Sequence, residues 1–232
     1  MRISLLVCIC MLACFVPANA NLILNGDFEL PVVGTAPPAF ASYPTGSVAI
    51  PDWTVVGAAG TEVSLVNGTY TKECCTFAPQ GGVQWLDLTG FASNQYEGVQ
   101  QAVPTTLGTT YDLSFWVGNA YDPAPGVFGT TSTVQLLING SGAVSFTNTM
   151  NTPNVLNWEM FTTTFVAGAG PTTLLGFYNL DPPTDNSNGL DSIVLTEEPI
   201  PEPGTLTLLG LGIIGLGLTR RLAKFSFHLP TR

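Results

Sequence analysis

Short apolar runs alternate with polar turns along residues 21–199, and almost no stretch there repeats apolar residues at the helical period of 3.6. The runs are rich in Val, Thr, Leu and aromatic residues, and clusters of Gly, Pro, Asn and Asp separate them. The alternation is clearest over residues 111–117, where Trp116 is predicted to point away from the core. The predicted core positions of this run are Tyr111, Leu113, Phe115 and Val117. This pattern predicts an all-β sandwich.

Predicted strands cover residues 22–24, 53–56, 62–66, 83–88, 97–103, 110–117, 132–138, 144–147, 158–166, 172–178 and 193–195. No internal repeat and no domain boundary is visible before Thr196. Residues 21–196 are therefore predicted to form one domain, which is long enough to bury a sizeable core. A short polar linker follows before the next apolar segment.

Residues 1–20 have the pattern of a secretory signal peptide. Arg2 supplies a minimal positive region, residues 3–16 are apolar, and Ala18 and Ala20 form an A-x-A cleavage site. Cleavage after Ala20 is predicted. Cys14 leaves a lipoprotein box as the alternative, with a much shorter apolar region.

A second apolar segment lies near the C-terminus. Residues 205–219 are predicted to form a single transmembrane helix of roughly 22 Å, shorter than a hydrocarbon core of about 30 Å. The basic side chains that follow, Arg220, Arg221 and Lys224, are long enough to reach back to the headgroups. A buried core helix or an apolar tail is the alternative. Residues 225–232 are predicted to be a short cytoplasmic tail.

The motif Pro201, Glu202, Pro203 precedes this helix, and the basic cluster follows it. This order across residues 197–224 resembles the PEP-CTERM sorting signal of Gram-negative bacteria. The resemblance implies export, transient anchoring in the inner membrane, and processing by an exosortase. It also implies delivery to the cell surface or the exopolysaccharide matrix. The extension at residues 225–232 departs from the family, whose chains usually stop soon after the arginines.

The predicted exported domain is strongly acidic. Lys72 is the only Lys or Arg in residues 21–199, which hold all of the chain's 16 acidic residues except Glu202. Such a charge balance argues against binding to nucleic acid or anionic lipid. It is compatible with calcium, with neutral sugars, or with the plain acidity of a soluble exported protein.

Catalytic signatures are scarce in this sequence. The single histidine, His228, lies beyond the predicted helix, so the exported domain has no Ser-His-Asp arrangement. We therefore predict that the protein is not an enzyme. A secreted glycoside hydrolase that uses two carboxylates is the alternative.

Two adjacent cysteines, Cys74 and Cys75, remain in the domain after signal cleavage. They would meet an oxidising compartment and lack the C-x-x-C spacing of a metal site. A vicinal disulfide or a thiol pair in a loop is predicted, with pairing to another chain left open.

Four segments carry a second resemblance: NLILNGDFELP (21–31), IPDWTV (50–55), VQWLDL (83–88) and LDSIVL (190–195). Together they resemble the galactose-binding-like jelly rolls of carbohydrate-binding modules and of DUF642-like cell-wall-associated proteins. The resemblance implies a jelly-roll β-sandwich that associates with carbohydrate. Ser192 departs from the family, which often has two adjacent aspartates before the last strand.

The same resemblance implies that the first and last strands lie together and hold a structural calcium ion. The positions that match the family are Asn25, Asp27, Glu29 and Asp191. Their carboxylate and amide oxygens are the ligands that calcium prefers. The alternative is that residues 25–27 form a turn and that Asp191 only accepts hydrogen bonds.

A sugar site needs exposed aromatic rings beside polar groups, and Trp85 and Trp116 are the leading candidates. Other candidate rings are Tyr121, Trp158 and Tyr178, although most aromatic residues of a sandwich pack in its core. The sequence therefore predicts an exported, non-catalytic surface or matrix protein that associates with polysaccharide. A structural or adhesive coat protein without a specific sugar site is the alternative.

Overall fold

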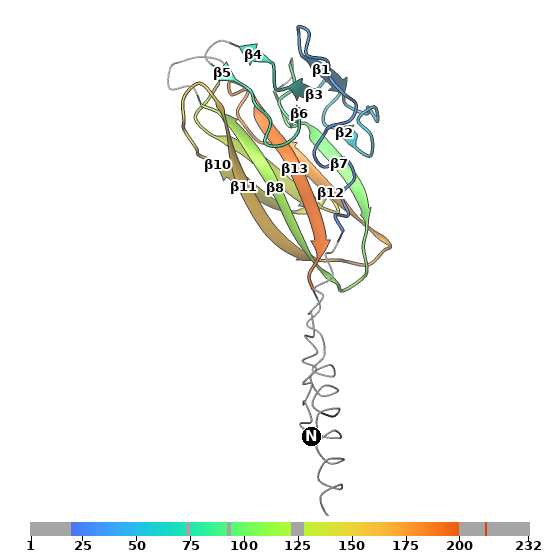
Figure 1. Ribbon diagram of the computed structural model, residues 1–232. Helices are drawn as coiled ribbons and strands as arrows, with labels where there is room; N and C mark the ends of the chain where they lie inside the picture. The colour runs from blue at the N-terminus through green and yellow to red at the C-terminus, as the bar shows by residue number, and fades with distance from the viewer. Residues whose placement is uncertain (1–19, 73–74, 92–93, 122–127, 200–211, 213–232) are drawn as a thin grey trace, which may run out of the picture. The chain divides into compact units, whose positions relative to one another are not determined.

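A computed structural model describes residues 20–72, 75–91, 94–121, 128–199 and Gly212. Within them two antiparallel sheets pack face to face (Figure 1). The larger sheet has the strand order β1 (Phe40–Pro44), β3 (Glu62–Asn67), β6 (Gln84–Asp87), β13 (Asn188–Glu197), β8 (Thr110–Ala120) and β11 (Leu156–Val166). The smaller sheet has the order β10 (Ser141–Asn148), β9 (Ser132–Ile138), β12 (Thr172–Asn179), β7 (Gly98–Pro104) and β2 (Thr54–Val56). A separate pair joins β4 (Thr71–Lys72) to β5 (Cys75–Thr76).

The chain crosses repeatedly between the two sheets. It does so from β7 to β8, from β8 to β9, and at each step from β10 to β13. Such crossing connections are typical of a double-sheet jelly roll. The predicted all-β sandwich is confirmed.

The core lies between the sheets and follows the period of two along each strand. On β8 the four predicted core residues, Tyr111, Leu113, Phe115 and Val117, are all buried there. Trp116 points to the opposite face of the sheet and is half-buried, as predicted.

The N-terminal segment lies beside the last strand, as the resemblance implied. Leu22 N donates to Leu195 O at 2.9 Å, and Ile193 N donates to Gly26 O at 2.8 Å. Gly26 permits this approach, because a Cβ there would lie 2.4 Å from Ile193 O. The prediction of a regular strand at residues 22–24 is wrong, because these few bonds do not continue as a ladder.

The chain divides into two compact units, Met1–Glu198 and Pro199–Arg232. Over the part of the chain that is described, no helix is long and apolar enough to cross a membrane. The predicted span at residues 205–219 lies outside the described residues, apart from Gly212. The predicted signal peptide lies outside them as well, apart from Ala20.

Candidate functional site

The outer face of the six-stranded sheet carries a second apolar cluster. Strand alternation sends Leu65 and Leu86 into the sandwich and therefore sends their neighbours Val66 and Trp85 to the outer face. The complete buried cluster is Val66, Phe77, Trp85, Ala120, Phe128 and Leu156. Phe77, which follows β5, and Phe128, in the loop after β8, cover this part of the sheet. A pocket lies beside Phe128.

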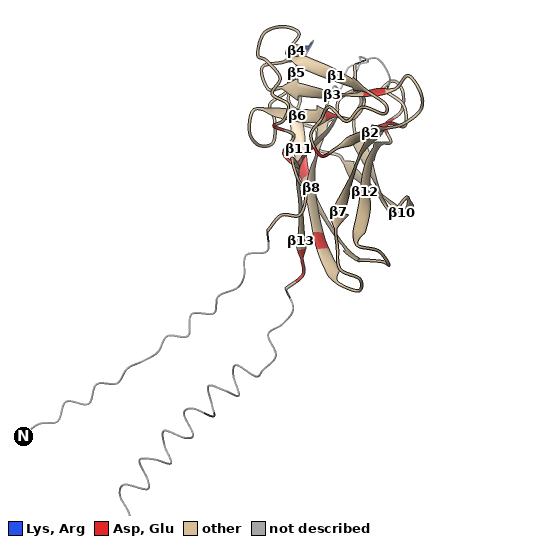
Figure 2. Cartoon of the chain, turned by 90° about the vertical axis from the view of Figure 1, so that its right-hand side faces the viewer, with Lys and Arg blue, Asp and Glu red and all other residues tan. Residues whose placement is uncertain are grey.

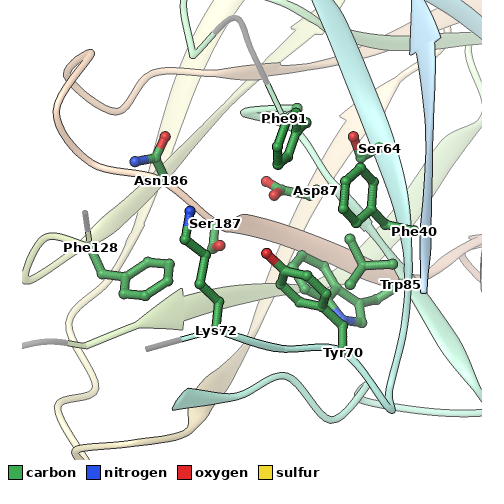
Figure 3. A pocket seen from close by; sticks show the side chains of 12 residues that line it. Phe40, Ser64, Tyr70, Lys72, Trp85, Asp87, Phe91, Phe128, Asn186 and Ser187 are labelled. Carbon is green, nitrogen blue, oxygen red and sulfur yellow. The ribbon is translucent and has the colours of Figure 1, made fainter. Parts of the chain in front are cut away.

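This pocket has a volume of about 110 Å³. It combines aromatic side chains with a carboxylate, an ammonium group, an amide and two hydroxyls of serine (Figure 3). The residues lining it are Phe40, Ser64, Val66, Tyr70, Lys72, Trp85, Asp87, Gly90, Phe91, Phe128, Asn186 and Ser187. They come from β1, β3, β4 and β6 and from the loops after β3, β6, β8 and β12.

Three aromatic rings form one wall of the pocket. Phe40 stacks on Phe91, with ring centroids 4.9 Å apart and an interplanar angle of 22°. Tyr70 meets Phe40 edge-on at 5.7 Å and 88°. Phe91 is 64% exposed, so its free face offers a stacking surface to a ligand.

Asp87 is the acidic group of the pocket. Its Oδ1 accepts hydrogen bonds from Thr89 N at 3.0 Å and from Thr89 Oγ1 at 2.8 Å, and these bonds fix the carboxyl group. Burial raises the pKa of Asp87 to about 7, and the nearby charge of Glu97 adds to the rise. The carboxyl group is therefore poised to exchange a proton near neutral pH. Figure 3 shows it among the rings of Phe40, Tyr70 and Phe91.

Lys72 brings a positive charge to the opposite side of the pocket. It lies at the end of β4, and Asn186 and Ser187 lie on the same side (Figure 3). Because Lys72 is the only Lys or Arg in residues 21–199, the sole cationic side chain of the domain lines the same pocket as Asp87.

A shallow depression continues the pocket across the surface. It has a volume of about 460 Å³ and shares Phe40, Tyr70, Lys72 and Phe91 with the deeper pocket. Its other walls are Thr35, Pro37, Pro38, Ala39, Thr69 and Thr71. The two hollows therefore lie next to each other and share these four side chains.

The two tryptophans predicted as sugar platforms have different surroundings. Trp85 is fully buried, and its Nε1 donates to Phe77 O at 3.0 Å. The prediction of Trp85 as a stacking platform is therefore wrong, because the ring forms the base of the pocket and has no free face. Trp116 lies on the outer face of β8, in register with Met160 and Asp191, and does not line the pocket.

The predicted calcium ligands lie near one another in part. Asp191 Oδ2 accepts from Gln80 N at 3.0 Å and Gly81 N at 3.2 Å. Glu29 Oε1 accepts from Val83 N at 2.8 Å and Gln84 N at 3.1 Å. The two carboxylates thus bind the backbone N–H groups at opposite ends of one segment, residues 80–84.

The other two predicted ligands have different roles. Asn25 bonds the backbone of Leu30 and Pro51, and Asp27 is exposed. No group of three or more His, Cys, Asp or Glu side chains that could hold a metal occurs among the described residues. Calcium binding at these four positions stays a prediction.

Several other predicted residues lie outside the described parts of the chain. They are Cys74, Ala18, the sorting motif Pro201, Glu202 and Pro203, and the basic residues Arg220, Arg221 and Lys224. Cys75 begins β5, but its side chain is not described. The disulfide or thiol-pair prediction therefore stays a prediction.

An aromatic surface on the other sheet combines Tyr178, a candidate ring from the sequence, with Tyr96, which the sequence did not indicate. Tyr96 stacks on Tyr178 with centroids 4.9 Å apart and an interplanar angle of 8°. The Tyr96 hydroxyl donates to Gln135 Oε1 at 2.6 Å, which fixes the ring beside an amide. Tyr178 and Gln135 are register partners on neighbouring strands. Their proximity depends on strand pairing and cannot be predicted from the local sequence.

The chain matches the PEP-CTERM protein-sorting motif over residues 199–221. This motif marks an exported protein that is sorted to the cell envelope or surface. The match covers the motif Pro201, Glu202, Pro203, the predicted helix at residues 205–219 and the two arginines that follow it. No curated protein matches the chain.

Solved structures of carbohydrate-binding proteins resemble the sandwich. The CBM22-1 xylan-binding domain of Paenibacillus barcinonensis Xyn10C is 14% identical with a TM-score of 0.41, over 69% of this chain and 95% of that one. A family 16 carbohydrate-binding module is 21% identical with a TM-score of 0.41, over 76% of this chain and 100% of that one.

Proposed function

We propose that this chain is a non-catalytic protein of the cell surface or the exopolysaccharide matrix, and that its sandwich binds polysaccharide in the pocket beside Phe91. The observation that carries the proposal is the pocket itself. It places an exposed aromatic face next to a carboxyl group, an ammonium group and an amide. A sugar ring presents apolar C–H groups on its faces and hydroxyls at its rim, so it needs this combination of partners.

The size of the pocket favours the end of a polysaccharide chain. About 110 Å³ is less than the roughly 150 Å³ cavity that holds benzene, so the deep pocket takes only part of one sugar ring. The shallow depression beyond Phe91 has room for the next unit. A terminal residue would enter the pocket, with the following sugar lying across the ring of Phe91.

The carboxyl groups around the pocket support a binding role. Glycoside hydrolysis generally uses two carboxyl groups about 5 to 9.5 Å apart on either side of the scissile bond. Among the residues that the structure describes, Asp87 is the only carboxyl residue that lines this pocket. One such group can orient a hydroxyl but cannot supply both the acid and the base.

Replacing the exposed ring tests the proposed site. Phe91→Ala should weaken binding to a recognised polysaccharide by about 10-fold or more. The estimate takes the stacking of a sugar on the ring to be worth as much as the stacking of a nucleobase, about 1 to 3 kcal/mol. Affinity electrophoresis of the full chain against a panel of soluble polysaccharides would measure the change. Asp87→Asn should weaken binding as well above pH 7, where the ionised carboxylate makes charge-assisted bonds that an amide cannot make.

Tyr96→Ala is the matched control, because it removes another exposed ring from the other sheet. If Tyr96→Ala abolishes binding and Phe91→Ala does not, the polysaccharide site lies on the five-stranded sheet. If all three variants bind as the wild type does, neither aromatic surface is the polysaccharide site. If the wild type binds no polysaccharide of the panel, a coat protein without a specific sugar site is the better account.

The sorting motif provides a separate prediction. Replacing Pro201, Glu202 and Pro203 together with alanine should leave the chain unprocessed and attached to the membrane. Cell fractionation and mass spectrometry of the C-terminus would show this. Recovery of the same mature terminus from the variant and the wild type would contradict the proposed processing.

A further inference from the structure

Two buried oxygen atoms at one end of the sandwich have no hydrogen-bond donor. Among the described residues, the buried side-chain atoms without a partner are Asp181 Oδ2, Asn188 Oδ1 and Glu159 Oε2. Asn188 has no exposed surface, and Asp181 is 7% exposed. A buried oxygen that lacks a donor costs about 1 to 3 kcal/mol, and more when it is charged.

The orientation of the Asn188 amide is fixed by its neighbours. Its Nδ2 donates to Thr133 O at 2.7 Å and to Asn179 Oδ1 at 2.8 Å. Turning the amide over would place Oδ1 against these two acceptors, so the oxygen must face the other way.

Asp181 shares both of these partners. Its Oδ1 accepts from Thr133 N, and its own N donates to Asn179 Oδ1 at 3.1 Å. The two side chains therefore both bond the backbone of Thr133, Asp181 at its N–H and Asn188 at its C=O. Their free oxygens belong to one small polar region at the ends of β9, β12 and β13.

A nearby hydroxyl is shared between two acceptors. A side-chain hydrogen bond from Ser132 lowers the pKa of Asp181, but the single proton of Ser132 Oγ is also directed at Asn119 Oδ1 at 3.2 Å, and Asp181 Oδ2 has no partner. A second carboxylate, Asp185, is near enough to raise the pKa of Asp181 and is itself held by Gly129 N at 2.7 Å. The region thus gathers acceptors and negative charge, and the only Lys or Arg of residues 21–199 is Lys72.

We propose that a hard cation, calcium in its extracellular setting, binds between Asp181 Oδ2 and Asn188 Oδ1 with support from Asp185. Carboxylate and amide oxygens are its preferred ligands, and water would complete its coordination. With only two carboxylates, the affinity should be in the weak range of extracellular calcium modules, about 10⁻⁴ to 10⁻³ M. This site is distinct from the positions around Glu29 and Asp191, and it does not depend on polysaccharide binding.

Calcium-dependent melting of the full chain in detergent tests the proposal. Addition of 10 mM calcium, against sodium chloride of equal ionic strength, should raise the wild-type Tm by about 3 °C. Asp181→Asn should abolish this rise. Its Tm in chelator should equal or exceed that of the wild type, because the new amide can still accept from Thr133 N and can donate to Asn188 Oδ1.

Two further variants keep the test decisive. Asp185→Asn should weaken the calcium response by several-fold. It keeps an acceptor for Gly129 N, so it can replace Asp181→Asn in the test if that variant does not fold. Glu29→Gln should leave the response intact. No calcium response in the wild type, or a response that survives both aspartate replacements, would overturn the proposal. A response lost only in Glu29→Gln would move the ion to the N-terminal positions.

Discussion

The free energy of unfolding should fall by at least about 3 kcal/mol between pH 5.5 and pH 8 when the full chain is held in chelator. This lower bound counts one proton, that of the most strongly shifted carboxyl group, which the native state retains over roughly two and a half pH units at about 1.4 kcal/mol per unit. Burial is the main cause, because it raises the pKa of Asp87 to about 7 and of Asp181 to about 8. Burial likewise raises the pKa of Asp191 to about 7 and of Asp185 to about 6.

The sign follows from proton linkage. In the unfolded chain these aspartates ionise near pH 3.9, so at pH 5.5 the native state holds protons that the unfolded state has released. Stability is therefore highest at low pH and is lost as the pH rises through the native-state pKa values. Few groups oppose this trend, since residues 21–199 contain no histidine and only one Lys or Arg. Their general acidity, which is scattered over strands and loops in Figure 2, acts in the same direction.

Urea denaturation at a series of pH values measures this effect. Asp181→Asn should flatten the profile between pH 6 and pH 8, whereas Asp27→Asn, at an exposed position, should leave it unchanged. Stability that rises toward pH 8 in chelator would contradict the prediction. Calcium should narrow the difference at high pH if the ion takes the place of the proton.

The alternation of side chains was sufficient to predict the sandwich core. Because the period of two is intrinsic to a strand, the inward and outward sides of β8 followed from residues 111–117 alone. The same rule continues to Asn119, an inward position that is polar and fully buried. A polar residue at this core position is therefore the one sequence feature that indicates the buried amide network at that end of the sandwich.

The pocket was not predictable from the sequence in the same way. Trp85 is a candidate by its residue type alone, whereas Asp87, two residues further along β6, lies on the same face and lines the same pocket. The covering residues, Tyr70, Lys72 and Phe91, lie outside all of the predicted strands, in segments without periodicity. Their approach to the sheet depends on tertiary packing, which no local pattern encodes.

Phe115→Ala should lower the free energy of unfolding by about 3 to 5 kcal/mol, the usual cost of removing a fully buried ring. Phe115 joins the two sheets, because its ring contacts Phe146 of β10 at 5.1 Å and Phe177 of β12 at 5.2 Å. Both contacts are edge-on, so no neighbouring ring can move into the space without losing its own packing. Phe91→Ala is the matched control, and it should cost less than about 1 kcal/mol because its ring is mostly exposed. Urea denaturation compares the two variants directly. Equal losses would show that Phe115 does not pack both sheets together, whereas a large loss for Phe115→Ala alone would separate the residue that holds the fold from the residue proposed to hold the ligand.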